Sequence, residues 1–170
     1  MANTLVKIAR IDVTGTSTTE GVFTSIPQTF SDLFIVVSAR SSYSATFASL
    51  GLVINATYAN YGFTAIQNLG SSVNSSTSAY RFIGSQPGAN ATSNTFGNTE
   101  IYIPGYTTSQ SKQIIVDSVA ENNSSSVGQE IIAYQTTLTA PVCDIWIGDA
   151  TSGLAFAPQS SFTLYGIKKS

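Results

Sequence analysis

Residues 32–40, DLFIVVSAR, contain the longest uninterrupted apolar run of the sequence. A strand with one solvated face alternates apolar and polar residues, but every position from Leu33 to Val37 is apolar. We therefore expect a strand that is covered on both faces and lies deepest in a sheet.

Short runs rich in Val, Ile, Phe, Tyr and Thr recur on both sides of this stretch, separated by Gly, Pro, Asn and Ser. No segment shows the 3.6-residue apolar stripe of an amphipathic helix, and no linker or repeat divides the chain. The pattern predicts an all-β fold: a single-domain antiparallel β-sandwich, jelly-roll-like, with about nine or ten strands over residues 1–170. The expected strands are residues 5–13, 22–26, 32–40, 49–55, 79–85, 99–105, 112–122, 129–139, 140–149 and 160–167.

The final stretch, residues 160–170, SSFTLYGIKKS, also has the pattern of a core strand, although it lies at the end of the sequence. Phe162, Leu164 and Tyr165 give apolar side chains to both of its faces. We expect this strand inside the sheet, beside residues 5–13, with the two lysines that follow it ending the pairing.

The sequence also predicts the arrangement of three other segments. Every second residue of residues 5–13, starting with Leu5, is expected on one face of a strand. Residues 112–122 and 129–139 flank the turn-like NSSSVG and predict a hairpin. Residues 56–78 are less regular and rich in Tyr, Asn and Ser, so we expect a long functional or interface loop with one strand at most.

Charged residues are scarce. They make up 9% of the sequence, against roughly 25% in typical soluble proteins. A surface of Ser, Thr, Asn, Gln, Gly and Ala is easily desolvated and suits extracellular particles and permanent assemblies, although any all-β protein with Ser/Thr-rich outer faces would share it. The net charge of −2 provides no basic field for nucleic acid.

No apolar run approaches the length of a membrane span, and the first residues do not resemble a secretion signal, so release by lysis is the expected route out of a cell.

The sequence lacks the commonest general base of active sites. Histidine is absent, which removes Ser-His-Asp and Cys-His catalysis and the commonest metal ligand. We therefore expect no enzyme activity, no cofactor and no metal. Asp144 and Asp149 flank the only tryptophan, Trp146, which suggests sugar stacking or a calcium site as alternatives to a core or interface role. Cys143, the only cysteine, is expected to be a small buried core residue.

Three segments resemble structural proteins of tailed-phage virions. They are IPQTFSDLFIVVSARSS at residues 26–42, PGANATSNTFGNTEIYIPGY at residues 87–106 and the closing motif at residues 156–169 within FAPQSSFTLYGIKKS. The resemblance covers both ends and the middle of the chain. It implies a jelly-roll-like sandwich in a homo-oligomer, often a trimer, and a place on the virion.

The resemblance and the scarcity of charge favour a capsid decoration (cement) protein. Such a protein would be made in the host cytoplasm, bind the outer capsid surface, contact the major capsid protein and stabilise the shell. Nucleic acid and membrane are not expected partners. The residues expected at the capsid or oligomer interface are Leu5, Lys7, Tyr58, Tyr61 and Phe63.

The alternative function is a receptor- or carbohydrate-binding head domain of a tail fibre or spike. Aromatic side chains would then stack on a host surface glycan, and Trp146 and Tyr106 are the candidates for this role.

Overall fold

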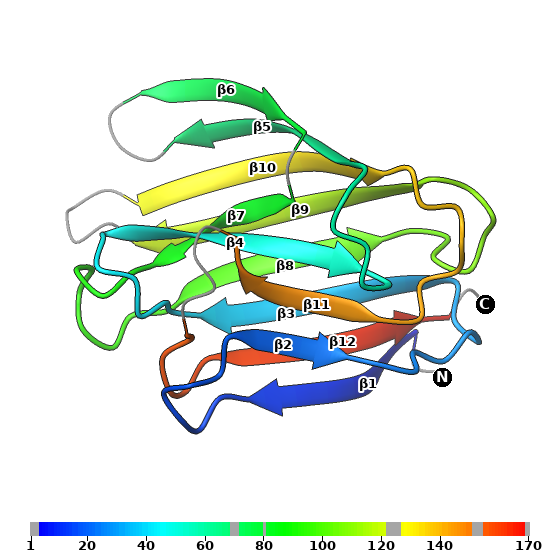
Figure 1. The fold of residues 1–170 in the computed structure, drawn as a ribbon, viewed down its shortest axis with the longest axis horizontal. Coiled ribbons are helices and arrows are strands. Elements are labelled where there is room, and N and C mark those ends of the chain that lie inside the picture. Colours follow the sequence, from blue (N-terminus) through cyan, green and yellow to red (C-terminus); the bar gives the residue numbers. More distant parts are fainter. Residues whose placement is uncertain (1–3, 69–71, 80, 122–126, 151–154, 169–170) are drawn as a thin grey trace.

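The computed structural model describes residues 4–68, 72–79, 81–121, 127–150 and 155–168. These residues form an all-β, jelly-roll-like sandwich of two antiparallel sheets, and they contain no helix. The large sheet has eight strands in the order β1-β12-β3-β8-β9-β10-β5-β6, and the small sheet has four in the order β2-β11-β4-β7 (Figure 1). The apolar core lies between the sheets.

The described residues contain twelve strands, slightly more than the sequence predicted. Two of them lie in residues 56–78, where one at most was expected: β5 and β6 pair along their whole length. The sequence of β6, VNSSTS, lacks the alternation of a half-buried strand, so only its backbone pairing reveals it. The strands are β1 (Leu5–Asp12), β2 (Glu20–Phe23), β3 (Asp32–Ala39), β4 (Phe47–Ile54), β5 (Tyr61–Asn68), β6 (Val73–Ser78), β7 (Phe82–Pro87), β8 (Gly97–Ile103), β9 (Lys112–Glu121), β10 (Val127–Thr136), β11 (Ile145–Asp149) and β12 (Ser161–Ile167).

The closing strand lies where the sequence placed it. β12 pairs with β1 on one side and with β3 on the other, so the prediction of an interior strand beside residues 5–13 is confirmed. Leu33, Ile35, Phe162 and Leu164 have no exposed surface, which confirms that β3 and β12 are core strands. The predicted hairpin is also present, as β9 and β10.

Strand β1 does not keep the simple alternation that its sequence suggested. The register with β12 shifts between Lys7 and Ala9, which is a β-bulge that inserts Ile8. Before the bulge Lys7 faces solvent, and after it Ala9 and Ile11 pack against the core. The prediction that every second residue from Leu5 shares one face is therefore wrong, because a single extra residue moves the apolar set to the other face.

Two other expectations are corrected by burial. Cys143 is exposed rather than buried, because it lies in the irregular segment before β11 while its neighbour Val142 takes the core position. Tyr106 has no exposed surface, and its hydroxyl donates a hydrogen bond to the Pro27 carbonyl. The ring is enclosed by the core, so it cannot stack on a glycan.

Gly166 in β12 lies directly under the ring of Phe30. A Cβ atom at this position would be 2.3 Å from Phe30 Cγ, far inside van der Waals contact. The missing side chain therefore lets the segment that enters β3 cross closely over β12.

We expect Gly166→Ala to destabilise the fold by about 1–3 kcal/mol, because Phe30 would have to leave its position or strain the backbone. The free energy of unfolding, measured by denaturant titration, checks this. Gly15→Ala is the matched control, since a Cβ there meets nothing within 4 Å. Equal stabilities of the two variants would contradict the packing argument.

A carboxylic acid lies in the space between the sheets. Glu130 is 1% exposed, and its Oε2 accepts a hydrogen bond from the Ser85 backbone amide at 2.5 Å, while Oε1 has no partner among the described residues. Burial disfavours the charged form and raises the pKa of Glu130 above its ordinary value of 4.5.

The raised pKa predicts a specific pH dependence. Folding favours the protonated carboxyl, so its stabilisation is complete below 4.5 and is lost as the pH rises through the folded pKa. Glu130→Gln keeps an amide oxygen for Ser85 and removes this dependence. Unfolding free energies from about pH 4 to 8 should therefore show wild type losing stability relative to Glu130→Gln as the pH rises.

Candidate functional site

The residues predicted at an interface divide into an exposed and a buried group. Leu5, Lys7 and Tyr58 are exposed. Tyr61 is only 6% exposed and stacks on Tyr134 at 5.5 Å between ring centroids, and Phe63 packs against Phe82. The second group therefore belongs to the core, because the segment expected to be a loop is strand β5 with its alternate side chains turned inward.

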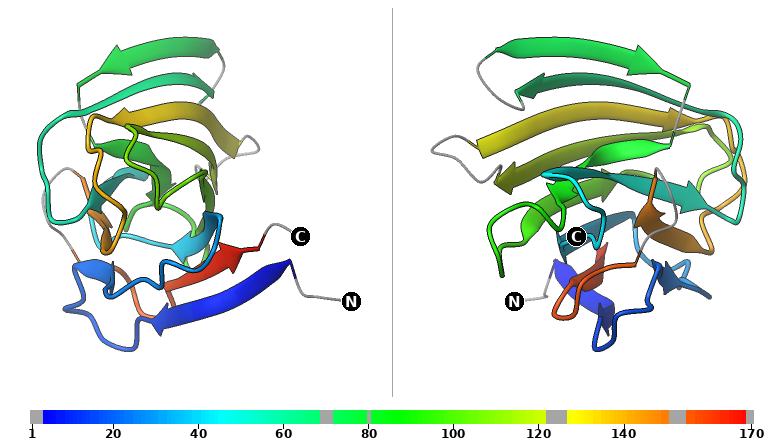
Figure 2. Two further views of the ribbon diagram at one scale, coloured as in Figure 1. Left: turned by 90° about the vertical axis from the view of Figure 1, so that its right-hand side faces the viewer. Right: turned by 60° about the vertical axis from the view of Figure 1, so that its left-hand side comes forward.

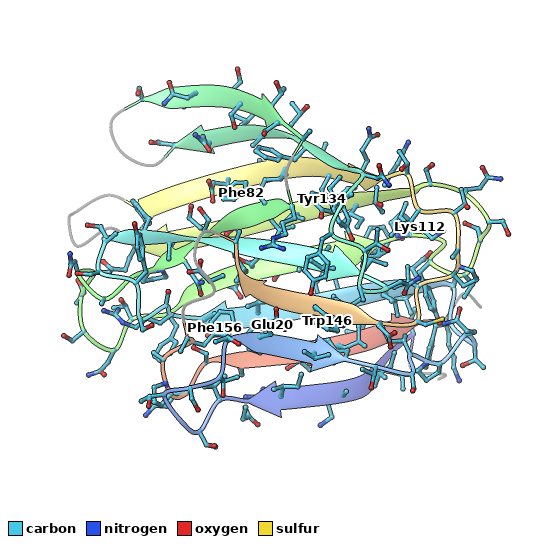
Figure 3. All side chains as sticks on the ribbon, in the orientation of Figure 1. Glu20, Phe82, Lys112, Tyr134, Trp146 and Phe156 are labelled. Atoms are coloured by element: carbon cyan, nitrogen blue, oxygen red, sulfur yellow. The ribbon has the colours of Figure 1, made fainter. Side chains whose placement is uncertain are left out.

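Trp146 lies on the outward side of the small sheet, close to Tyr58. Their ring centroids are 6.3 Å apart in an edge-to-face arrangement, and the Arg81 guanidinium lies 5.5 Å from the centre of the Tyr58 ring. Figure 3 shows Trp146 on β11 and Glu20 on the neighbouring β2. This aromatic cluster (Tyr58, Arg81, Trp146) brings together residues far apart in the sequence.

Two hollows meet at Arg81 beside the aromatic cluster. One, of about 260 Å³, is lined by Tyr58, Asn60 and Arg81 among others. The other is only about 20 Å³ and lies between Arg81, Trp146 and Glu20. Flat rings beside a guanidinium and a carboxylate can stack on a sugar ring and hydrogen-bond its hydroxyls.

The acidic residues that flank Trp146 are not brought together. Asp144 lies just before β11, where its Oδ1 accepts a hydrogen bond from the Ser25 amide at 3.2 Å. Asp149 ends the strand, is 6% exposed and accepts a hydrogen bond from Ser41 Oγ at 3.3 Å. No group of three or more His, Cys, Asp or Glu side chains within the described part of the chain is placed to hold a metal.

The outward face of the large sheet carries apolar side chains that sequence analysis did not select. Ile66, Ile115 and Ile131 are 57%, 60% and 54% exposed. Ile131 lies directly opposite Ile66, on the neighbouring strand β5. The sequences of β9 and β10 contained the signal, since each places two isoleucines in succession, which puts one of them on either face. We call Ile66, Ile115 and Ile131 the isoleucine patch.

The patch continues across the sheet towards β1. Ile115 lies opposite Tyr102, which lies opposite Phe34, which in turn lies opposite Tyr165. The next residue in this row is Lys7, so this residue of the predicted interface shares the outward face with the isoleucine patch. A row of partly exposed aromatic and aliphatic side chains therefore crosses four neighbouring strands, β9, β8, β3 and β12, and ends at Lys7 on β1.

An open groove of about 840 Å³ lies at one end of the isoleucine patch. Its lining includes the outward-facing Gly62, Thr64, Ile115, Ala133 and Gln135. Gly62, Thr64 and Ala133 are small, which leaves space beside the exposed Ile115 side chain. The lining also includes the inward-facing Tyr61, Ile114 and Tyr134, so the groove is not confined to the outward face.

Two carboxylates lie in the middle of the same face. Glu100 on β8 is directly opposite Asp117 on β9, and both side chains are exposed. Like charges in directly opposite positions repel, and the one ion pair among the described residues, Arg10 with Asp12, is elsewhere. A cation from outside the chain would relieve this repulsion.

Comparisons with known proteins give no family for this chain. No family model matches the sequence, and no curated protein matches it. Two solved structures show distant similarity. A toad ovary galectin in complex with thio-digalactose is 12% identical, with a TM-score of 0.37, and the match covers 86% of this chain and 98% of that one. CG-16, a homodimeric agglutinin from chicken liver, is 12% identical, with a TM-score of 0.35, covering 84% of this chain and 98% of that one. Both similarities are too weak to assign a ligand or partner.

No helix among the described residues is long and apolar enough to cross a membrane.

Proposed function

We propose that this chain is a non-enzymatic structural protein of a tailed-phage virion, which binds the outer surface of the capsid and stabilises the shell. The observation that carries the proposal is the outward face of the large sheet, with its exposed isoleucine patch. Isolated exposed apolar residues are ordinary, but a contiguous group on one sheet face is typical of an interaction surface. The sequence motifs shared with virion proteins support the same function.

The polarity of strand β6 strengthens the assignment of this surface. On β6 the inward positions are polar, such as Asn74 and Ser76, whereas the outward neighbours Val73 and Ile66 are 68% and 57% exposed. A strand selected only to cover its own core would have the opposite polarity, as β5 has with Tyr61 turned inward. The outward side of this hairpin is therefore suited to burial against a partner.

The chemistry of the face describes the partner. It should present apolar side chains to the isoleucine patch and a Lys or Arg to the Glu100–Asp117 pair. The partner in this proposal is the major capsid protein, on the outside of an icosahedral shell. Because few charges surround the patch, binding need not desolvate many unpaired ions.

We expect Ile131→Lys to weaken binding to capsids that lack the protein by about ten- to a hundredfold, since burying an isoleucine contributes about 1.5–3 kcal/mol. Co-sedimentation over a concentration series measures this, with circular dichroism as a check of folding. Val22→Lys is the control, because it adds the same charge to an exposed apolar position on the small sheet. Capsids coated with wild type should also resist heat and osmotic shock better than bare ones. Normal binding by Ile131→Lys, or equal rupture of coated and bare capsids, would contradict the proposal.

The second candidate function is carbohydrate binding by a tail-fibre or spike domain, favoured by the aromatic cluster on the small sheet. Here the recognised ligand would be a host surface glycan, stacked on Trp146 and hydrogen-bonded by Arg81. The two functions use opposite faces of the sandwich and can be separated by mutation.

If this candidate is right, a glycan array should show saturable binding that Trp146→Ala removes and Trp146→Phe partly keeps, because phenylalanine retains a flat ring. Ile131→Lys serves as the control and should bind glycans normally. The absence of any glycan signal for the wild-type protein would remove this candidate.

A further inference from the structure

The sandwich has four sheet edges, and three of them are protected against pairing with another chain. β1 carries Lys7, Arg10 and Asp12 and is interrupted by the bulge at Ile8. β2 has only four residues. Charges, bulges and short length are the usual means of preventing edge-to-edge association.

The edge of β7 is covered by side chains from the other sheet. The Ser85 amide donates to Glu130, and the Ser85 carbonyl accepts a hydrogen bond from Ser118 Oγ at 3.2 Å. The strand also ends at Pro87, which has no amide hydrogen to offer.

The edge of β6 has none of these protections. Its six residues contain no charge, proline or glycine, and its pairing with β5 is regular from Val73 to Ser78. No strand in the described part of the chain pairs with its other side. In both views of Figure 2, β6 lies at the far end of the large sheet, beyond the small sheet.

We propose that β6 pairs antiparallel with β6 of a second copy of this chain, joining two large sheets into one. The occupant is a second copy because the edge is compatible with itself. The sequence contains no Asp, Glu, Lys or Arg between Arg40 and Arg81, so two copies meet here without repulsion. By contrast, the outward face of the large sheet carries Lys7, Glu100 and Asp117, so a face-to-face contact between copies would have to desolvate charges.

Symmetry restricts the register of this contact. A two-fold axis perpendicular to the sheet keeps outward side chains outward in both copies. With the axis at Ser75, this residue faces Ser75 of the second copy, and Val73 faces Thr77 of the second copy. With the axis at Ser76, Ser76 faces its own equivalent. In either register Val73 adds an exposed apolar side chain near the seam.

Sedimentation velocity of the purified full chain, without capsids, tests the proposal. We expect a dimer that dissociates on dilution. Ser75→Lys places two like charges near the axis and should raise the dissociation constant at least tenfold. Gln129→Lys is the matched control, because it adds the same charge to an exposed outward position of β10, away from the edge.

Cysteine cross-linking gives an independent readout of the register. Facing residues of an antiparallel pair have Cα atoms about 4.5–5.5 Å apart, which a disulfide can span. In a Cys143→Ser background, Ser75→Cys or Ser76→Cys should form a covalent dimer on mild oxidation, and Gln129→Cys should not.

The proposal is overturned if the protein stays monomeric throughout the dilution series. It is also overturned if Ser75→Lys leaves the oligomer unchanged and neither Ser75→Cys nor Ser76→Cys forms a cross-link. A trimeric oligomer would overturn it as well. Because no capsid is present, this result is independent of the capsid-binding test.

Discussion

The close packing of β12, β3 and β8 is the constraint on which the rest of the sandwich depends. β3 pairs with β12 on one side and β8 on the other, and Phe30 covers Gly166 where the chain enters β3. These three strands are the second to fourth of the large sheet, counted from β1. They also carry the three segments on which the proposed resemblance to virion proteins rests, although these motifs are far apart along the chain.

Hydrogen bonds join the motifs in the same region. Asp32, at the start of β3, accepts from the Gly105 amide at 2.8 Å and from the Tyr102 hydroxyl at 3.1 Å. At the other end of β3, the Arg40 guanidinium donates to carbonyls of the loop before β8, including Thr92 at 2.6 Å and Ala91 at 3.0 Å. Tyr106 belongs to this network rather than to a binding surface. The motif residues therefore stabilise the fold. Taken alone, the motifs say more about the architecture of the protein than about its binding partners.

The sequence predicted the features that depend on apolar pattern and missed those that depend on pairing. β3 and β12 were predictable because their apolar runs exceed what a half-exposed strand needs. β6 was not, since its polar residues carry no burial signal and only β5 holds it in place. The burial of Tyr61 and Tyr106 could not be predicted from the sequence, because tyrosine occurs both in cores and on binding surfaces. The isoleucine patch was missed because two consecutive isoleucines put one side chain on each face of a strand, and the sequence does not show that the outward face lacks a covering layer.

The few charged side chains are distributed unevenly over the protein, so its surfaces suit different partners. The outward face of the large sheet combines apolar residues with two adjacent carboxylates, which suits a partner that brings a cation. The uncharged β6 edge suits a second copy instead, because no charge has to be desolvated there. A two-fold pairing at that edge leaves the outward faces of both copies on the same side. The dimer would then offer one partner two linked sites, and linked sites bind more tightly than either alone without any new contact. Modest burial on each copy would therefore be enough for a stable attachment.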